Sequence, residues 1–230
     1  MVSAKDILIK PITAHAANAL VKKVHYSGKV VANSNLHFGV FLDGKLEGVM
    51  SFGSPMVKKN AHNLVSDTTW NGMLELNRMA FSDVLPKNSE SRALSIAFNL
   101  IRKHYPHIEW ILSYSDATQC GDGAIYRASG FVLTSIKENS QLGVCPKTGD
   151  VMQSMAAYHA GKAKDFKNWE KLKGYQLRYI YFLNKDAKQR LTVPILPFSK
   201  IDEMGAGMYK GVKVSREKQA MDVSNITAAG

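Results

Sequence analysis

The sequence has only two cysteines, Cys120 and Cys145, and no paired cysteine spacing. So few thiols argue against a disulfide-stabilised secreted scaffold and against a zinc finger. The chain also lacks any run of about 18 apolar residues. Lys5, Lys10 and Lys22 interrupt the apolar stretches that a secretory signal would need. We therefore expect a cytoplasmic protein that does not span a membrane.

Acidic residues are scarce beside basic ones: 19 Asp and Glu stand against 30 Lys and Arg, for a formal charge of +11 and a pI near 9.6. Such a surplus indicates a polyanionic partner, with nucleic acid the first to consider. Hydrophobic residues make up 45% of the 230. That content is enough for one or two packed domains and argues against a disordered or fibrous chain.

Apolar spacing and turn signals predict an α/β order of elements. The ranges are helix 14–24, strands 36–42, 45–52 and 74–81, a long helix around the stripe 93–101, strand 110–115, helix 124–129, and strands 131–136 and 175–183. Asp43-Gly44 predicts a tight hairpin turn. The long helix implies a parallel crossover, and Asp116 ends its second strand, where active sites are favoured.

The predicted organisation is a catalytic domain over 1–190, with an insertion at about 137–174, followed by an irregular arm over 191–230. Residues 158–190 hold nine Lys or Arg against three acidic residues. Aromatic residues are interleaved with them: Tyr158, Trp169, Tyr175, Tyr179 and Tyr181. The pattern predicts a DNA-contacting rim, and the alternative is a solvated basic face over core aromatics.

One segment resembles a motif of the GCN5-related N-acetyltransferase superfamily: Ile125-Tyr-Arg-Ala-Ser-Gly-Phe131. With the element order, this resemblance implies an acetyltransferase-like α/β fold, a mixed central sheet flanked by helices. The superfamily's glycine-rich phosphate loop is missing, since residues 86–93 have no glycine and include Glu90. Because glycines let the backbone approach a pyrophosphate, this departure argues against acetyl-coenzyme A.

A narrower resemblance covers roughly residues 20–185. It is carried by His25-Tyr26-Ser27-Gly28, Glu75-Leu-Asn-Arg-Met-Ala-Phe81, Leu85-Pro-Lys-Asn-Ser-Glu-Ser-Arg92, and Ser113-Tyr-Ser-Asp116 with Gly121 and Tyr126. These motifs resemble the phage Mu Mom family of DNA modification proteins. The resemblance implies conversion of adenine in double-stranded DNA to N6-carbamoylmethyl (acetamido) adenine, which protects phage DNA from host restriction. It leaves the group donor unidentified.

An exocyclic adenine amine is a weak nucleophile, so the enzyme must position it and take its proton or activate the donor. Tyr126 is the first catalytic candidate, because the acetyltransferase resemblance implies a tyrosine there that protonates a departing group. The alternative is a hydrogen-bonded core tyrosine. Asp116 is the second candidate, because it ends a predicted parallel strand.

Arg78 and Ser91 are candidates for both catalysis and cofactor binding. Arg78 lies on a predicted central strand, where a charge needs a partner. It therefore pairs with a carboxylate such as Glu75 or faces a ligand anion. Ser91 lies in the first turn of the long helix, where a hydroxyl and backbone donors can hold a phosphate or carbonyl. Ordinary helix capping is the alternative for Ser91.

The metal-ligand candidates are His25, Tyr26 and Asp116. Imidazole, phenolate and carboxylate suit iron in an open site better than zinc, and the family resemblance implies iron. Two adjacent ligands need irregular backbone, which Ser27-Gly28 permits. A structural His-Tyr pair is the alternative.

Three functions remain open from the sequence: a DNA adenine-modifying transferase, an acetyl-coenzyme A dependent N-acetyltransferase of a protein or small amine, and a non-catalytic DNA-binding module. The oligomeric state is also open, with a homodimer among the options.

Overall fold

The computed structural model describes residues 2–25, 27–117, 123–139 and 141–205, together with strand residues 208–209 and 212–213. Tyr26 and Cys120 lie outside the described residues. The chain divides into two compact units. The first unit comprises Met1–Tyr114, Ala124–Thr134 and Tyr179–Ile195, and the second comprises Ser115–Gly123, Ser135–Arg178 and Leu196–Gly230.

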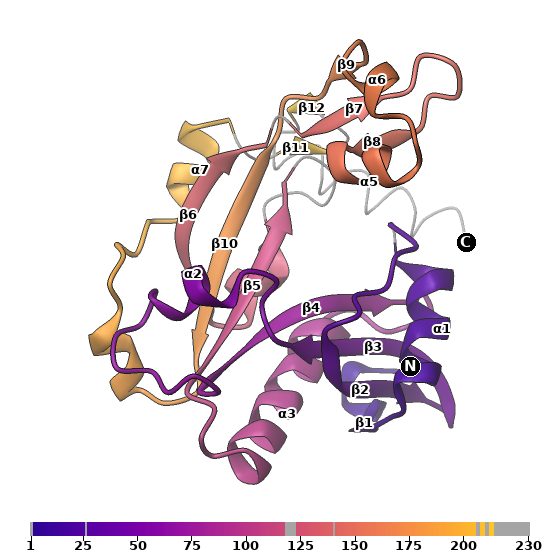
Figure 1. Cartoon of the computed structure of the whole chain (residues 1–230). Coiled ribbons are helices and arrows are strands. Elements are labelled where there is room, and N and C mark those ends of the chain that lie inside the picture. The colour runs from indigo at the N-terminus through magenta and orange to yellow at the C-terminus, as the bar shows by residue number, and fades with distance from the viewer. Residues whose placement is uncertain are drawn as a thin grey trace. The chain divides into compact units, whose positions relative to one another are not determined.

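A seven-stranded sheet within the described chain has the order β1-β2-β3-β4-β5-β10-β6 (Figure 1). Its strands are β1 (Leu8–Pro11), β2 (Ser34–Leu42), β3 (Lys45–Gly53), β4 (Met73–Phe81), β5 (Trp110–Asp116), β6 (Val132–Glu138) and β10 (Tyr175–Phe182). The pairs from β1 to β4 are antiparallel, whereas β4 and β5 are parallel. The predicted mixed sheet is confirmed.

Helices flank this sheet, as the sequence predicted. The described helices are α1 (Ala14–Val24), α2 (Lys58–His62), α3 (Ser89–His104), α4 (Ala124–Ala128), α5 (Ser154–His159), α6 (Ala163–Phe166) and α7 (Ser199–Glu203), with 3-10 turns η1 (Ala4–Asp6) and η2 (Asp186–Arg190). The shorter strands are β7 (Leu142–Val144), β8 (Val151–Gln153), β9 (Glu170–Lys171), β11 (Met208–Tyr209) and β12 (Val212–Lys213). α7, β11 and β12 lie in the predicted arm.

Local chemistry explains the elements that were predicted. The Thr13 hydroxyl accepts a hydrogen bond from the Ala16 amide at 3.3 Å and so caps α1. Asp43 and Gly44 adopt φ of 48° and 76°, the left-handed backbone that a two-residue hairpin turn requires. β1 and α2 were not predicted, because an edge strand of four residues and a helix of five leave almost no periodic signal.

α1 and α3 cover opposite faces of β2 to β4. On one face, Ala17 and Val21 of α1 pack with Val49 and Ala80 in a buried cluster. On the other face, the Phe52 ring packs edge-on against Phe98 of α3, with the ring centroids 6.4 Å apart. These faces are called the α1 face and the α3 face below.

The predicted insertion folds as part of the second unit. Strands β7, β8 and β9 form an antiparallel sheet in the order β8-β7-β9. A cluster of Cys145, Ala157, Phe166 and Trp169 forms its core. Two of the aromatics expected on a DNA-contacting rim are therefore internal: Trp169 here, and Tyr179 in the first unit. Tyr158 is 65% exposed, so it alone of these three fits the predicted rim.

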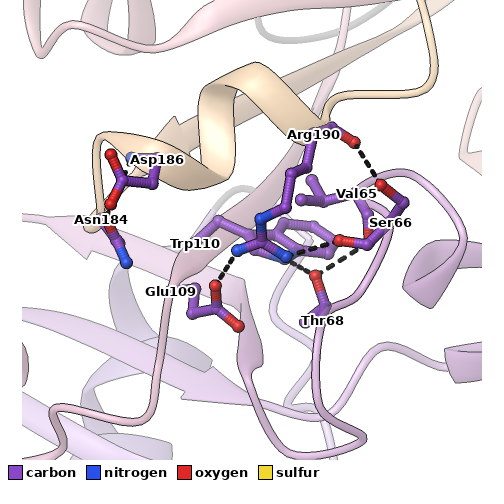
Figure 2. A network of polar contacts seen from close by, with 8 residues as sticks. All are labelled: Val65, Ser66, Thr68, Glu109, Trp110, Asn184, Asp186 and Arg190. Carbon is purple, nitrogen blue, oxygen red and sulfur yellow. Dashed lines mark hydrogen bonds and ion pairs between the residues drawn. The ribbon is translucent and has the colours of Figure 1, made fainter.

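A polar network fixes the segment between β3 and β4 to the chain after β10 (Figure 2). The Arg190 guanidinium forms an ion pair with Glu109 and donates to the Ser66 carbonyl at 2.5 Å. The buried Trp110 indole donates to the Thr68 hydroxyl at 3.0 Å. The buried side chains of this segment, Ala61, Leu64 and Val65, pack in a core cluster with Trp110.

Candidate functional site

A β-bulge in β4 brings Glu75 and Arg78 to one face of the sheet. Ser51 pairs with Arg78, whereas Gly53 pairs with Glu75, and the register shifts between Ser51 and Phe52. Paired residues share a face, and residues two apart in a strand share a face as well. Asn77 is the extra residue of the bulge. Without it, two residues three apart in β4 would point to opposite faces.

This shared face is the α1 face. Val49, which packs against α1, lies two residues before Ser51 in β3. α1 ends at Val24, and the chain that follows passes over the bulge. The Arg78 Nε–H donates to the Lys29 carbonyl at 2.9 Å, and Ser34 Oγ donates to Asn77 Oδ1 at 3.2 Å. The loop between α1 and β2 therefore covers Glu75 and Arg78.

Gly53, the strand partner of Glu75, makes this covering possible. A Cβ at Gly53 would lie 1.9 Å from the Asn33 carbonyl oxygen, far inside contact distance. Any larger residue would displace the end of the α1–β2 loop. This constraint could not be predicted from the sequence, because Gly53 and Asn33 are twenty positions apart.

Glu75 has the electrostatics of a proton acceptor. Burial raises the pKa of its carboxyl to about 7, although the Arg78 guanidinium partly opposes that rise. A general base works best when its pKa lies near the working pH. Sequence reasoning treated Glu75 only as a partner for Arg78. Its burial could not be inferred from a strand containing both charged and apolar residues.

His25, the C-cap of α1, lies close to Arg78. Burial and then the Arg78 guanidinium lower the pKa of His25 to about 4, so the imidazole is neutral near pH 7. The Ser27 amide donates to His25 Nδ1 at 3.1 Å. Nδ1 therefore accepts, and the single ring proton belongs on Nε2. The structure thus brings together two of the predicted residues, His25 and Arg78, and adds Glu75.

A buried polar row continues from Arg78 across the sheet. Arg78 pairs with Ser51, and Ser51 pairs with His37 of β2. His37 Nδ1 and Ser51 Oγ are 2.8 Å apart, and burial lowers the pKa of His37. Sequence reasoning assigned His37 no function. The sequence did carry a signal for this pair. His37 and Ser51 each precede a core phenylalanine in a strand, and neighbouring strand residues point to opposite faces, so both polar side chains lie on the face opposite the phenylalanines.

The sheet opens immediately after Glu75. The parallel ladder pairs Met73 with Trp110, Leu74 with Ile111 and Glu75 with Leu112. Beyond these pairs, β4 and β5 diverge (Figure 1). Directly after the last pair, the Ser113 hydroxyl donates to the Leu76 carbonyl at 3.4 Å, so a side chain spans the two strands there.

Tyr126 lies on the α3 face. Its ring stacks on the buried Tyr179, with centroids 5.0 Å apart and planes inclined by 22°. Tyr181, two residues on and hence on the same face of β10, stacks on Phe98 of α3 at 4.2 Å. Tyr126 thus belongs to an aromatic cluster, as the core alternative expected, and its side chain is partly exposed.

Ser91 lines a pocket of about 470 Å³ between α3 and α4. The pocket walls include Ser91, Arg92, Ser95, Phe98, Ser129 and Tyr181. Ser91 Oγ donates to the Asn88 carbonyl at 3.2 Å, a side-chain-to-backbone bond within the first turn of α3. It differs from a helix cap, in which the side chain accepts from a backbone amide. Arg92 and the hydroxyl groups make the pocket suitable for a polar or anionic group.

Asp116, half-buried at the end of β5, belongs to the second unit. Tyr26 lies outside the described residues. Within the described ranges, no three His, Cys, Asp or Glu side chains gather as a metal site. A metal-bound imidazole normally donates from its other nitrogen, whereas His25 Nδ1 accepts from Ser27. This hydrogen-bond pattern at His25 does not fit a metal-bound imidazole. Iron binding therefore stays a prediction that rests on the family resemblance alone.

Comparisons with known proteins bear on this site. Residues 6–200 match the Mom protein family. The chain is 34% identical over 197 residues to the methylcarbamoylase Mom of Escherichia phage Mu, covering 83% of this chain and 81% of that relative.

No helix in the described ranges is long and apolar enough to cross a membrane.

Solved acetyltransferases are similar at the level of the fold. An IAA acetyltransferase from Bacillus cereus is 13% identical with a TM-score of 0.46, over 76% of this chain and 99% of that one. A ribosomal-protein alanine N-acetyltransferase from Escherichia coli is 12% identical with a TM-score of 0.46, over 77% of this chain and 94% of that one. Likeness at this level carries no conclusion about activity.

Proposed function

This chain belongs to the Mom protein family, and from that membership we propose that it transfers a carbamoylmethyl group to N6 of adenine in double-stranded DNA. The observation that carries the proposal is the half-buried Glu75 beside Arg78, at the point where β4 and β5 diverge. A carboxyl with a pKa of about 7 suits proton removal from a weakly nucleophilic amine.

The proposed step balances as a nucleophilic substitution. The N6 lone pair forms a bond to the methylene carbon of an electrophilic carbamoylmethyl donor. The bond from that carbon to its leaving group breaks, and the leaving group takes the electron pair. Glu75 accepts the N6 proton. In this proposal, Arg78 and the neutral His25, which lie close together, position the base or the donor amide.

The donor approaches from the α3 face in this proposal. Ser91, Arg92 and Ser95 line the pocket that would hold its polar part. Tyr126 supplies a phenol that protonates the leaving group, in line with the motif that includes Tyr126 and Gly130-Phe131. Asp116, at the end of β5, stays a proposed catalytic residue.

Double-stranded DNA is the proposed partner, and the +11 charge supports it. The second unit presents exposed Lys164, Lys167 and Lys173, and the exposed Tyr158. Lysines neutralise phosphates without reading sequence, so this surface would position the duplex. Reaching N6 requires the target base to leave the stack. Phage DNA is modified inside the host, so the proposal places the chain in the cytoplasm.

The α3–α4 pocket favours one other candidate, an N-acetyltransferase that uses acetyl-coenzyme A. Arg92 and Ser91 would face its phosphates. Against it, Glu90 adds negative charge to the first turn of α3. A melting shift with micromolar acetyl-coenzyme A, and none with duplex DNA, would favour this candidate over ours.

The direct test is nucleoside mass spectrometry on plasmid DNA from cells expressing the chain. We expect deoxyadenosine carrying one added carbamoylmethyl group, and none with Glu75→Gln expressed at the same level. Unmodified nucleosides from the wild-type culture would overturn the proposal. Unmodified DNA together with salt-sensitive duplex binding would identify a DNA-binding module instead.

A further inference from the structure

Three large apolar side chains stand exposed on the segment between β3 and β4. Met56 is 89% exposed, Val57 is 57% exposed and Trp70 is 55% exposed. We call Met56, Val57 and Trp70 the apolar knob. Single exposed apolar residues are ordinary, but a cluster of three on one segment indicates a surface that meets a partner.

The knob is rigidly supported from below. Ala61, Leu64 and Val65 of the same segment are buried in the core. Hydrogen bonds also fix the segment: Arg190 donates to the Ser66 carbonyl, and Trp110 donates to the Thr68 hydroxyl (Figure 2). The backbone below the knob is therefore held in place, so docking orders mainly the exposed side chains.

Trp70 is also braced within the knob. The Lys58 ammonium lies 4.7 Å from its ring centroid and donates to Asn71 Oδ1 at 3.0 Å. The His62 ring lies 5.3 Å from the Trp70 ring. Because Lys58 follows Val57 in the chain, the same lysine joins the Met56-Val57 tip to Trp70. The residue after Val57 therefore contacts the Trp70 ring, which places Trp70 close to the Met56-Val57 end of the segment.

Charge identifies the class of partner. Lys58 and Lys59 flank the knob, and Asp67 is the only acidic residue in 54–72. An apolar tip bordered by ammonium groups complements duplex DNA, whose base stack is apolar and whose edges are phosphates.

The segment also starts beside the proposed active site. It leaves the sheet at Gly53, the strand partner of Glu75. Met56 is three residues further, so its Cα lies within about 11 Å of the Gly53 Cα at full extension. A side chain at that distance can reach the stack next to an extruded base.

We propose that the apolar knob is a wedge that enters the base stack and fills the space left by the target adenine. This inference rests on the proposed function. Extruding a base costs a few kcal/mol of pairing and stacking. An inserted apolar side chain keeps the remaining bases from closing the gap.

The test compares two short fluorescein-labelled duplexes, one intact and one with a single abasic site that already opens the stack. Met56→Ala with Val57→Ala, and separately Trp70→Ala, should bind the intact duplex about tenfold more weakly than wild type. Both variants should bind the abasic duplex within about twofold of wild type. Leu8→Ala is the matched control, because Leu8 is 58% exposed on the edge strand β1.

Other results would overturn the wedge. If the knob variants bind both duplexes with wild-type affinity, the knob does not contact DNA. The exposed apolar side chains would then be a surface for a protein partner. Equal weakening on both duplexes would show phosphate contact alone, which is the result expected of Lys59→Gln, since Lys59 is exposed and is not one of the residues that brace Trp70. Unchanged melting temperatures confirm that the variants fold.

The two proposals fail separately. Modified adenine from wild type, combined with wild-type affinities of the knob variants, would end the wedge and leave the enzyme function standing. Unmodified adenine from wild type would end the proposed function, while the two-duplex comparison would still decide whether the knob enters DNA.

Discussion

The two faces of the central sheet carry different chemistry. The α1 face holds a buried row of titratable and hydrogen-bonding groups, with Glu75 and Arg78 beneath a loop. The α3 face holds the stacked rings of Tyr126 and Tyr179 beside a pocket lined by Ser91. In the proposed mechanism, this difference places proton removal and donor binding on opposite sides of one sheet.

Glu75→Gln should have the largest effect, because it removes the proton acceptor of the α1 face and keeps its shape. We expect modification to fall by about 10²- to 10⁴-fold. Adenine modification in plasmid DNA measures this loss, and duplex affinity should not change. If the Glu75→Gln variant is active, Glu75 is not the general base, and the proton acceptor is not on the α1 face.

Tyr126→Phe tests the α3 face. The substitution keeps the ring stacked on Tyr179 and removes only the hydroxyl, so stability should change little. We expect modification to fall by about 10²-fold, a typical loss for one general acid. Tyr105→Phe, at an exposed tyrosine after α3, is the control. Equal activity of the two variants would reduce Tyr126 to a packing residue.

The pH dependence of stability sharpens the account of Glu75. Its pKa rises on folding from 4.5 to about 7, so the folded chain binds the proton more tightly than the unfolded chain. Between these pH values stability falls as pH rises, by about 3 kcal/mol in total. Denaturant unfolding of wild type and Glu75→Gln should diverge across this window. Parallel curves would mean that the pKa of Glu75 does not rise on folding.

Charge reversal in the second unit should have the smallest effect. Lys164→Glu with Lys167→Glu should weaken duplex binding several-fold, evenly across sequences and less at high salt. Lys171 is a poorer choice, because its ammonium donates to the Phe166 carbonyl and lies over the Phe166 ring. Lys45→Glu controls for net charge. Weakening confined to one sequence would contradict phosphate contact.

Elements with strong local signals were predictable. Asp43-Gly44 specifies its hairpin through the left-handed backbone that both residues adopt. Thr13 caps α1 where its pattern begins. Arg78, Ser91 and Tyr126 were singled out through motifs, but those motifs did not say which face each residue occupies. The bulge at Asn77 decides that for Arg78, and it depends on pairing with β3.

The sequence by itself determined the order of the main elements, the basic charge and the family, because these depend on residue types and short spacings. Only the tertiary structure decided that Glu75 lies half-buried beside Arg78, that His37 extends the polar row, and that Met56, Val57 and Trp70 are exposed. The physical reason is that burial, strand register and proton affinity depend on residues distant in the chain, which no local pattern contains.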